Sequence, residues 1–163
     1  MDEILDSIDG ISTNKKTFNT ASKNKRLTNY LIDMVGYLIL SMFIGVAIGI
    51  LALGTGTEAV FLEGEETSPI AAKLTEWLWG MVVVVLYYTV MEYFFKGKTL
   101  GKFITKTRAV TLENERLDFQ TTFIRSLCRV IPFETFSFIG EESNGWHDSI
   151  SKTKVIEDDG WYE

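Results

Sequence analysis

A long stretch without formal charge, from Met34 to Thr57, places the strongest constraint on how this chain can fold. As a helix rising 1.5 Å per residue, such a stretch is long enough to cross a hydrocarbon core of about 30 Å. Apolar residues also concentrate in a second block, about 74–95, and the charged residues lie outside both blocks. The pattern predicts two transmembrane helices, about 26–53 and 74–95, and a membrane protein that is mainly α-helical.

An acidic residue, Asp33, lies at the beginning of the first apolar block, two helical turns after Arg26. A carboxylate at full depth in a bilayer costs roughly 2.5–3.5 kcal/mol, so it is usually paired, turned toward protein, or functional. Arg26 and Asp33 share nearly the same helix face, which makes Arg26 the expected partner that sets the pKa of Asp33. Arg125 and Arg129 are the alternative partners, reaching from a later helix.

The composition argues against several classes of function. The net charge is −6 and no basic stripe dominates, so no nucleic-acid partner is expected. Cys128 is the single cysteine and His147 the single histidine, which excludes an internal disulfide and argues against a metal site. Residues 146–149 place a base, an acid and a hydroxyl side by side, but a salt-bridging Asp148 is the expected reading. We therefore expect no enzyme, no catalytic residue, no cofactor and no metal.

The charge pattern divides the chain into three parts. We expect a cytoplasmic N-terminal tail over 1–25, a membrane domain over 26–157 and a C-terminal tail over 158–163. Within the membrane domain, 96–157 is predicted to be a cytoplasmic segment.

Basic residues next to the two apolar blocks predict the orientation. They precede the first helix and follow the second, whereas the connection 57–73 carries only Lys73. Both termini are therefore predicted to be cytoplasmic, in a multi-pass protein of the inner (plasma) membrane. Asp33 and Glu92 then lie at similar depth, toward the inner leaflet.

Two short elements are predicted after the second transmembrane helix. Thr99 is expected to cap a helix that runs to Ile104, and a strand is expected over 105–112. Residues 104–111 resemble residues 150–157, Ile-Thr-Lys-Thr-Arg-Ala-Val-Thr against Ile-Ser-Lys-Thr-Lys-Val-Ile-Glu. The matching alternation predicts that these segments pair into a small, β-hairpin-like cytoplasmic element.

A basic amphipathic helix is predicted over 119–131, with Asp118 as its N-cap and Pro132 ending it. Arg125 and Arg129 share one side of this helix at a spacing of one turn, and apolar residues form the other side. Such a helix suits the inner membrane surface or a shallow re-entrant position. We expect at least one of its arginines to form a buried ion pair. The alternative is that these arginines bind lipid phosphates.

Three small residues, Ser41, Gly45 and Gly49, recur every fourth position of the first apolar block. Such a strip allows close helix approach, because packing drives helix association in lipid. We expect it to pack either against the second helix or against a second copy of the chain.

Four features taken together resemble the RDD family of bacterial membrane proteins. They are Arg26 and Asp33 at the start of the first helix, the segment Gly97-Lys-Thr-Leu-Gly-Lys102, Arg125, and the pair His147-Asp148 before a terminal strand. The family takes its name from one arginine and two aspartates, and the resemblance places them at Arg26, Asp33 and Asp148. It covers about residues 20–157. The chain departs from longer members in its third apolar region, which Arg129, Pro132 and Glu134 interrupt.

The resemblance implies a role in transport. Members of this family are mostly uncharacterised, and monovalent cation/proton antiport is reported for some of them. Two helices cannot enclose a polar path, so a transporter of this kind requires a homo-oligomer. Asp33 would bind the proton or cation, Glu92 would be a second carrier, and Arg125, Arg129 and Asp148 would complete the charge cluster.

A non-transport role is the competing hypothesis. In this reading the protein is a membrane adaptor or assembly factor, and the arginine and aspartate cluster only holds the helices together. The partners expected are the lipid bilayer and further copies of the chain in both readings, with monovalent cations and protons in the first.

Overall fold

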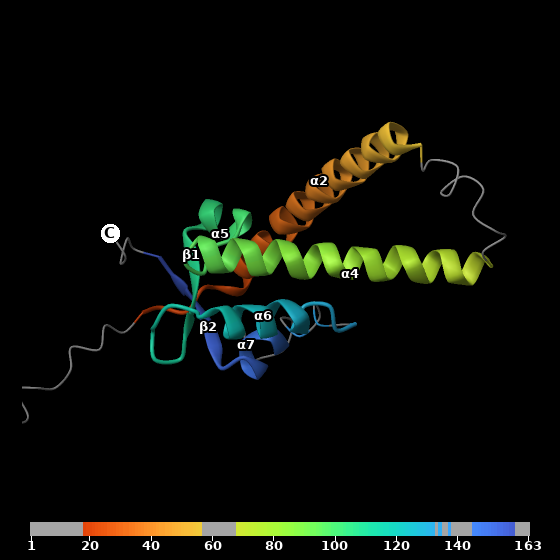
Figure 1. Ribbon diagram of the computed structural model, residues 1–163. Helices are drawn as coiled ribbons and strands as arrows, with labels where there is room; N and C mark the ends of the chain where they lie inside the picture. The colour runs from red at the N-terminus through yellow and green to blue at the C-terminus, as the bar shows by residue number, and fades with distance from the viewer. Residues whose placement is uncertain (1–17, 57–67, 133, 135–136, 138–144, 159–163) are drawn as a thin grey trace, which may run out of the picture.

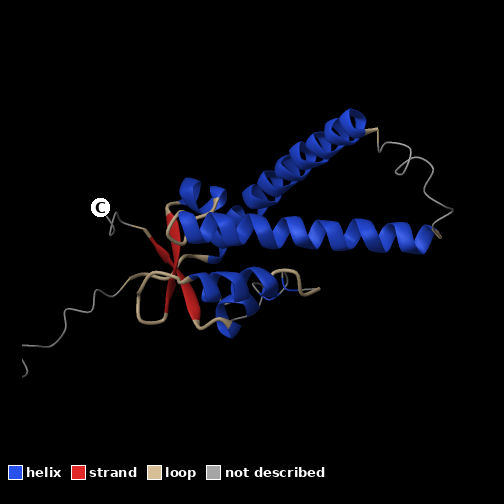
Figure 2. Ribbon diagram, viewed as in Figure 1, coloured by secondary structure: helices blue, strands red, loops and turns tan. Residues whose placement is uncertain are grey.

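A computed structural model describes residues 18–56, 68–132, 134, 137 and 145–158 of the chain. The helices and strands are α2 (Lys23–Thr55), α4 (Pro69–Phe94), α5 (Leu100–Thr105), β1 (Thr107–Thr111), α6 (Phe119–Cys128), α7 (Trp146–Ile150) and β2 (Thr153–Glu157). The two long helices extend from one end of the molecule, where the short helices and the sheet gather (Figures 1 and 2). Two long helices, an amphipathic helix and a small sheet agree with the predicted fold class.

Capping residues explain why both long helices begin earlier than predicted. The side chain of Ser22 accepts a hydrogen bond from the backbone N–H of Lys25, and Ser68 accepts one from Ala71. Each serine satisfies a donor that the first helical turn leaves open. At the far end of α2, Gly56 adopts a left-handed conformation with φ 68° and closes the helix.

The long helices meet near the sheet and diverge away from it (Figure 1). A Cβ built at Gly36 would lie 2.9 Å from the Tyr87 hydroxyl oxygen, so the two helices approach closely there. A Cβ at Gly45 or Gly49 would meet no atom of the described chain within 4 Å. We expected the strip that contains Ser41 to pack against the second helix, and for a single chain this expectation was wrong. Contact of the strip with a second copy of the chain stays a prediction.

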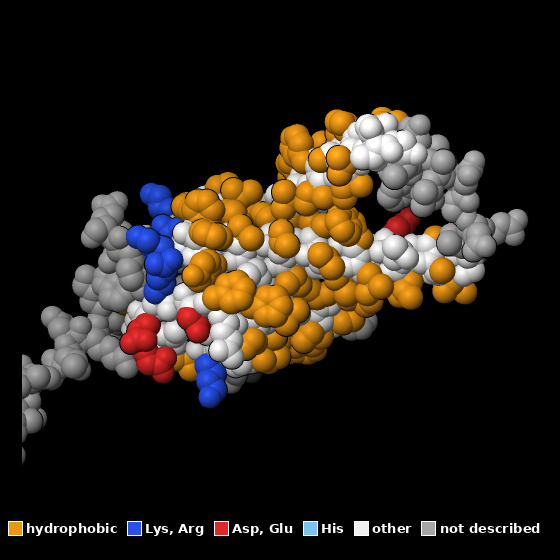
Figure 3. Space-filling model, in the orientation of Figure 1, with side chains coloured by type: hydrophobic (Ala, Val, Ile, Leu, Met, Phe, Trp, Pro, Cys, Tyr) orange, Lys and Arg blue, Asp and Glu red, His pale blue; other side chains and the backbone are white. Residues whose placement is uncertain are grey.

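Both long helices are apolar and poorly covered by the rest of the protein. Within the most apolar 18 residues of each helix, 6% are buried in α2 and 11% in α4. Each helix is long and apolar enough to cross a membrane. Figure 3 shows hydrophobic side chains over most of this face of the molecule, with the charged side chains concentrated toward the sheet end. This distribution fits a membrane-associated protein, since monomers in water rarely expose apolar patches of that extent.

The predicted strand pairing is confirmed. β1 and β2 form an antiparallel two-stranded sheet in which Ala109 faces Val155, and Thr20 adds an isolated bridge to Ile156. The strands are not joined by a turn, because α6 and α7 lie between them in the sequence. In this respect the expected hairpin-like connection was wrong.

The helix α6 lies alongside the second half of α4 (Figure 1). Asp118 caps it, as predicted, by accepting a hydrogen bond of 2.9 Å from the Thr121 N–H. The helix ends at Cys128, before the predicted bound at 131. Pro132 has no N–H to donate to the Cys128 carbonyl, and that carbonyl instead accepts from Ile131 in a tighter turn.

Candidate functional site

Buried charged side chains from five helices and the segment after α6 converge where these elements meet. This charge cluster contains four cationic side chains and four carboxylates, namely Arg26, Lys102, Arg125 and Arg129 and Asp33, Glu92, Glu134 and Asp148. No side chain in it is more than 9% exposed. The burial of so many ionised groups requires that most of them be paired.

Arg125 is the centre of the cluster and is completely buried. Its Nε donates to Oε2 of Glu92 at 2.9 Å, and its Nη1 donates to Oδ1 of Asp148 at 2.6 Å. The same Nη1 also contacts the hydroxyl of Thr153. One side chain of α6 therefore connects α4, α7 and β2, and the predicted buried ion pair for the arginines of this helix is confirmed.

Glu92, near the end of α4, accepts from three cations. Besides Arg125, it accepts from Lys102 Nζ at 2.7 Å and from Arg129 Nη2 at 3.3 Å. The Arg129 guanidinium also lies 4.1 Å from the ring centroid of Tyr88. Burial lowers the pKa of Lys102 to about 8, although the neighbouring Glu92 opposes the shift.

Asp148 pairs with two arginines. Its Oδ2 accepts from Arg26 Nη1, and its Oδ1 accepts from Arg125. Burial alone would raise the pKa of Asp148, but the positive charges around it hold that pKa well below its usual range. The expected pairing of Arg26 with Asp33 was thus wrong. Two turns separate these residues by about 10 Å along the helix axis, so each side chain meets a different set of neighbours.

Asp33 is held in a different way from the other carboxylates. Its Oδ1 accepts from the Tyr87 hydroxyl at 3.0 Å and from the Gly101 N–H at 2.8 Å, and its Oδ2 accepts from the Thr99 hydroxyl at 2.6 Å. Among the described residues, no lysine, arginine or histidine forms a salt bridge with it. Asp33 is therefore a buried carboxylate whose described hydrogen-bond donors are neutral.

The approach of α5 to α2 makes this arrangement of donors possible. A Cβ built at Gly101 would lie 2.4 Å from the backbone oxygen of Asn29, so no other residue fits there without a shift. The side chain of Thr99 caps α5 by accepting from the Lys102 N–H, and its hydroxyl donates to Asp33. The segment 97–102 is thus positioned on α2 by close backbone packing.

The single histidine belongs to the edge of the cluster. His147 Nδ1 contacts Oε1 of Glu134. Burial, together with the charge of Arg129, lowers the pKa of His147 to about 4, so the imidazole is neutral at pH 7. Burial raises the pKa of Glu134, but the hydrogen bonds from His147 and the positive charge of Arg129 together outweigh it, and the net shift is downward. A neutral imidazole therefore donates to a carboxylate.

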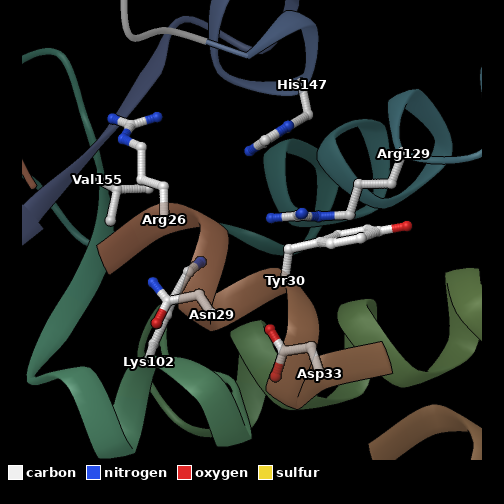
Figure 4. Close-up of a pocket in the computed structure, with 8 residues that line it drawn as sticks. All are labelled: Arg26, Asn29, Tyr30, Asp33, Lys102, Arg129, His147 and Val155. Atoms are coloured by element: carbon white, nitrogen blue, oxygen red, sulfur yellow. The ribbon is translucent and has the colours of Figure 1, made fainter. Parts of the chain in front are cut away.

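A small cavity lies inside the cluster (Figure 4). The volume open to the centre of a water molecule is about 20 Å³, which is room for a single water. The side chains of Lys102, Arg129 and His147 point toward one another across it, and Asp33 lies on its border (Figure 4). The cavity is also lined by Arg26, Asn29, Tyr30 and Val155.

The structure brings six of the sequence-predicted site residues together: Arg26, Asp33, Glu92, Arg125, Arg129 and Asp148. Sequence reasoning did not predict the neutral donors of Asp33, nor that Lys102, Glu134 and His147 belong to the cluster. Lys102 and Thr99 do lie in the segment that carries the family resemblance, which was the available signal. Among the described residues, no group of three or more His, Cys, Asp or Glu side chains is arranged to hold a metal ion.

Comparison with known proteins gives one match. No curated protein and no solved structure matches the chain. The model of the RDD family matches residues 20–152, which include the long helices and all of the charge cluster. Because this match covers most of the sequence, the chain belongs to the RDD family.

Proposed function

We propose that this protein exchanges monovalent cations for protons across the membrane, with Asp33 as the carboxylate that binds and releases them. The main support for this proposal is that the described hydrogen-bond donors of Asp33 are neutral. Glu92 and Asp148 each contact at least two cationic side chains, so protonating either one would leave buried positive charge unpaired. Asp33 can take up a proton or a cation without breaking any described ion pair.

The neighbours of Asp33 suit such an exchange. The hydroxyls of Tyr87 and Thr99 can each rotate from donating to accepting, so they can follow a change in the charge of the carboxylate. Carboxylate and hydroxyl oxygens are also suitable ligands for a hard cation. Lys102 borders the same cavity, and burial holds its pKa below its ordinary value. Glu92, which was expected to be a second carrier, is better suited to a fixed structural role.

The proposed setting is the inner membrane, with two spans and both termini in the cytoplasm. The described ends of the chain lie together, because Thr20 bridges Ile156 and Glu157 donates its N–H to Asn19. Termini on one side of the membrane require an even number of spans, which agrees with α2 and α4. The basic residues on that side support a cytoplasmic location.

Transport also requires more than one copy of the chain. Two helices that diverge cannot enclose a polar path (Figure 1). No atom of the described residues lies within 4 Å of a Cβ built at Gly45 or Gly49, so the small-residue strip is suited to a helix of a second copy. We therefore propose a homo-oligomer in which this strip lies at the contact between subunits.

A second candidate function is a membrane adaptor or assembly factor without transport. The ion pairs of Arg125 favour it, because they connect α6 with α4 and α7 and so have an evident structural role. In this reading Asp33 only fixes the segment 97–102 against α2.

Asp33→Asn separates the two functions, because it keeps the shape of the side chain and removes its charge and its titrating proton. Cation-driven proton movement is measured in inverted membrane vesicles, and assembly and thermal unfolding are measured in detergent. For an exchanger, the variant assembles, melts close to the parent protein and loses exchange, while the exposed control Glu115→Gln retains it. Retained exchange in Asp33→Asn overturns Asp33 as the exchanging carboxylate, and absence of exchange in the parent protein overturns the transport proposal. Loss of assembly in the variant supports the structural role.

A further inference from the structure

The helix α6 follows α4 from its inner end toward the middle of the apolar stretch (Figure 1). Near its beginning, the ring centroid of Phe119 lies 5.6 Å from that of Tyr93. Near its end, Arg129 lies over Tyr88, and the next residue, Val130, borders the same groove as Met81. From Tyr93 back to Met81 the α4 axis covers about 18 Å at 1.5 Å per residue. This length is more than half of a hydrocarbon core of about 30 Å.

The two sides of α6 meet different surroundings. Its charged side faces inward, where Arg125 is completely buried in ion pairs with Glu92 and Asp148. Its other side is apolar and exposed, with Phe119 at 56% and Leu127 at 47%. An amphipathic helix at the surface of a soluble domain has the reverse orientation, with its apolar side covered and its charged side in water.

The exposed side of α6 continues the apolar surface of α4. Residues of both helices, among them Val82, Leu86, Phe123 and Leu127, line one shallow apolar groove. In Figure 3 hydrophobic side chains cover this region without a charged side chain between them. If lipid chains surround α4, the same chains reach α6, because no described segment separates the two helices on this face.

We propose that α6 is a re-entrant helix, whose apolar side contacts the acyl chains of the inner leaflet along α4. The charge cluster then lies below the headgroup region, enclosed by protein. Charged residues at such depth are costly unless they face protein and pair with one another, as Arg125 does here. The inference rests on the proposed insertion of α2 and α4 and adds the depth of a third helix.

Depth measurements on spin-labelled cysteine variants test this placement. Single cysteines replace Leu127 on α6, Val82 on α4 and Glu115 in the turn after β1, each in a Cys128→Ser background and in vesicles of phosphatidylethanolamine and phosphatidylglycerol. Collision rates of each label with oxygen and with a water-soluble nickel complex are compared. The oxygen-to-nickel ratio at Leu127 should approach that at Val82 and exceed that at Glu115 several-fold.

The three labels separate failure of this inference from failure of the proposed membrane insertion. A Leu127 label as open to nickel as Glu115, with Val82 still protected, overturns the re-entrant placement alone. A Val82 label open to nickel overturns the insertion of α4 and the inference together. A Leu127 label protected from both reagents overturns the lipid contact and indicates a covering protein subunit. A label at Phe123, on the same groove, replaces Leu127 if the melting temperature of that variant falls.

Discussion

Arg26 and Asp148, which are 122 positions apart in the sequence, form a buried ion pair between α2 and α7. Asp148 also pairs with Arg125, so this carboxylate joins the first helix to the amphipathic helix. The pairing explains why two charged residues near opposite ends of the family match belong to one site. Because Arg26 pairs with Asp148, Asp33 on the same helix accepts its described hydrogen bonds from neutral donors.

Arg26 should therefore be coupled energetically to Asp148 and not to Asp33. In a double-mutant cycle measured by unfolding in detergent, Arg26→Gln with Asp148→Asn should give a coupling energy of about 1–3 kcal/mol. Each single change leaves a buried charge without its partner, which the second change relieves. The matched cycle of Arg26→Gln with Asp33→Asn should give less than about 0.5 kcal/mol, the usual error of additivity. Stronger coupling to Asp33 than to Asp148 would refute the observed pairing.

Gly101→Ala should destabilise the protein, because its Cβ would lie 2.4 Å from the Asn29 backbone oxygen. We expect a loss of about 1–3 kcal/mol in the free energy of unfolding, typical of overpacking. Gly80→Ala in α4 is the matched control, since its Cβ meets no described atom within 4 Å and alanine favours the helix. Thermal unfolding of both variants in detergent provides the test, and equal melting temperatures would contradict the close contact of α5 with α2.

His147 should make the stability of the fold depend on pH between about 4 and 6.5. The folded-state pKa of His147, about 4, lies below the model-peptide value of 6.5, so the unfolded chain binds more protons in this window. Stability is therefore fully present above pH 6.5 and falls as the pH drops toward 4, by about 3 kcal/mol at 1.36 kcal/mol per pKa unit. Chemical unfolding at several pH values measures this dependence.

His147→Gln is the control for that pH dependence, because it removes the titrating group and keeps a donor for Glu134. The slope between pH 5 and 6.5 should flatten in this variant. In that range Glu134 and Asp148, whose pKa values are lowered, remain ionised and contribute little to the slope. An unchanged slope would assign the pH dependence to another group.

The proposed orientation predicts opposite labelling of two cysteine positions on intact cells. In a Cys128→Ser background, a cysteine at Glu63, outside the described residues, should react with an impermeant reagent. A cysteine at Glu115, in the exposed turn after β1, should react only after the membrane is opened. The reverse pattern would show that the termini face outward.

Several elements followed from local sequence pattern. The uncharged stretches specified the two long helices, because their composition needs no distant contact to be recognised. Asp118 and Thr99 were recognisable as caps, since each satisfies an N–H three residues further along the chain. The sequence similarity between residues 104–111 and 150–157 likewise predicted that the two strands pair.

The assignment of charge partners could not be read from spacing within one helix. Periodicity placed Arg26 and Asp33 on one face, but an ion pair forms only where tertiary packing brings the charged atoms within a few ångströms. The helix α7 places Asp148 next to Arg26. Gly101 allows α5 to lie close to α2, and this approach places the donors next to Asp33. The sequence thus determined which residues carry charge in an apolar setting. Packing between distant segments determined which of them are neutralised by ion pairs and left Asp33 with neutral donors.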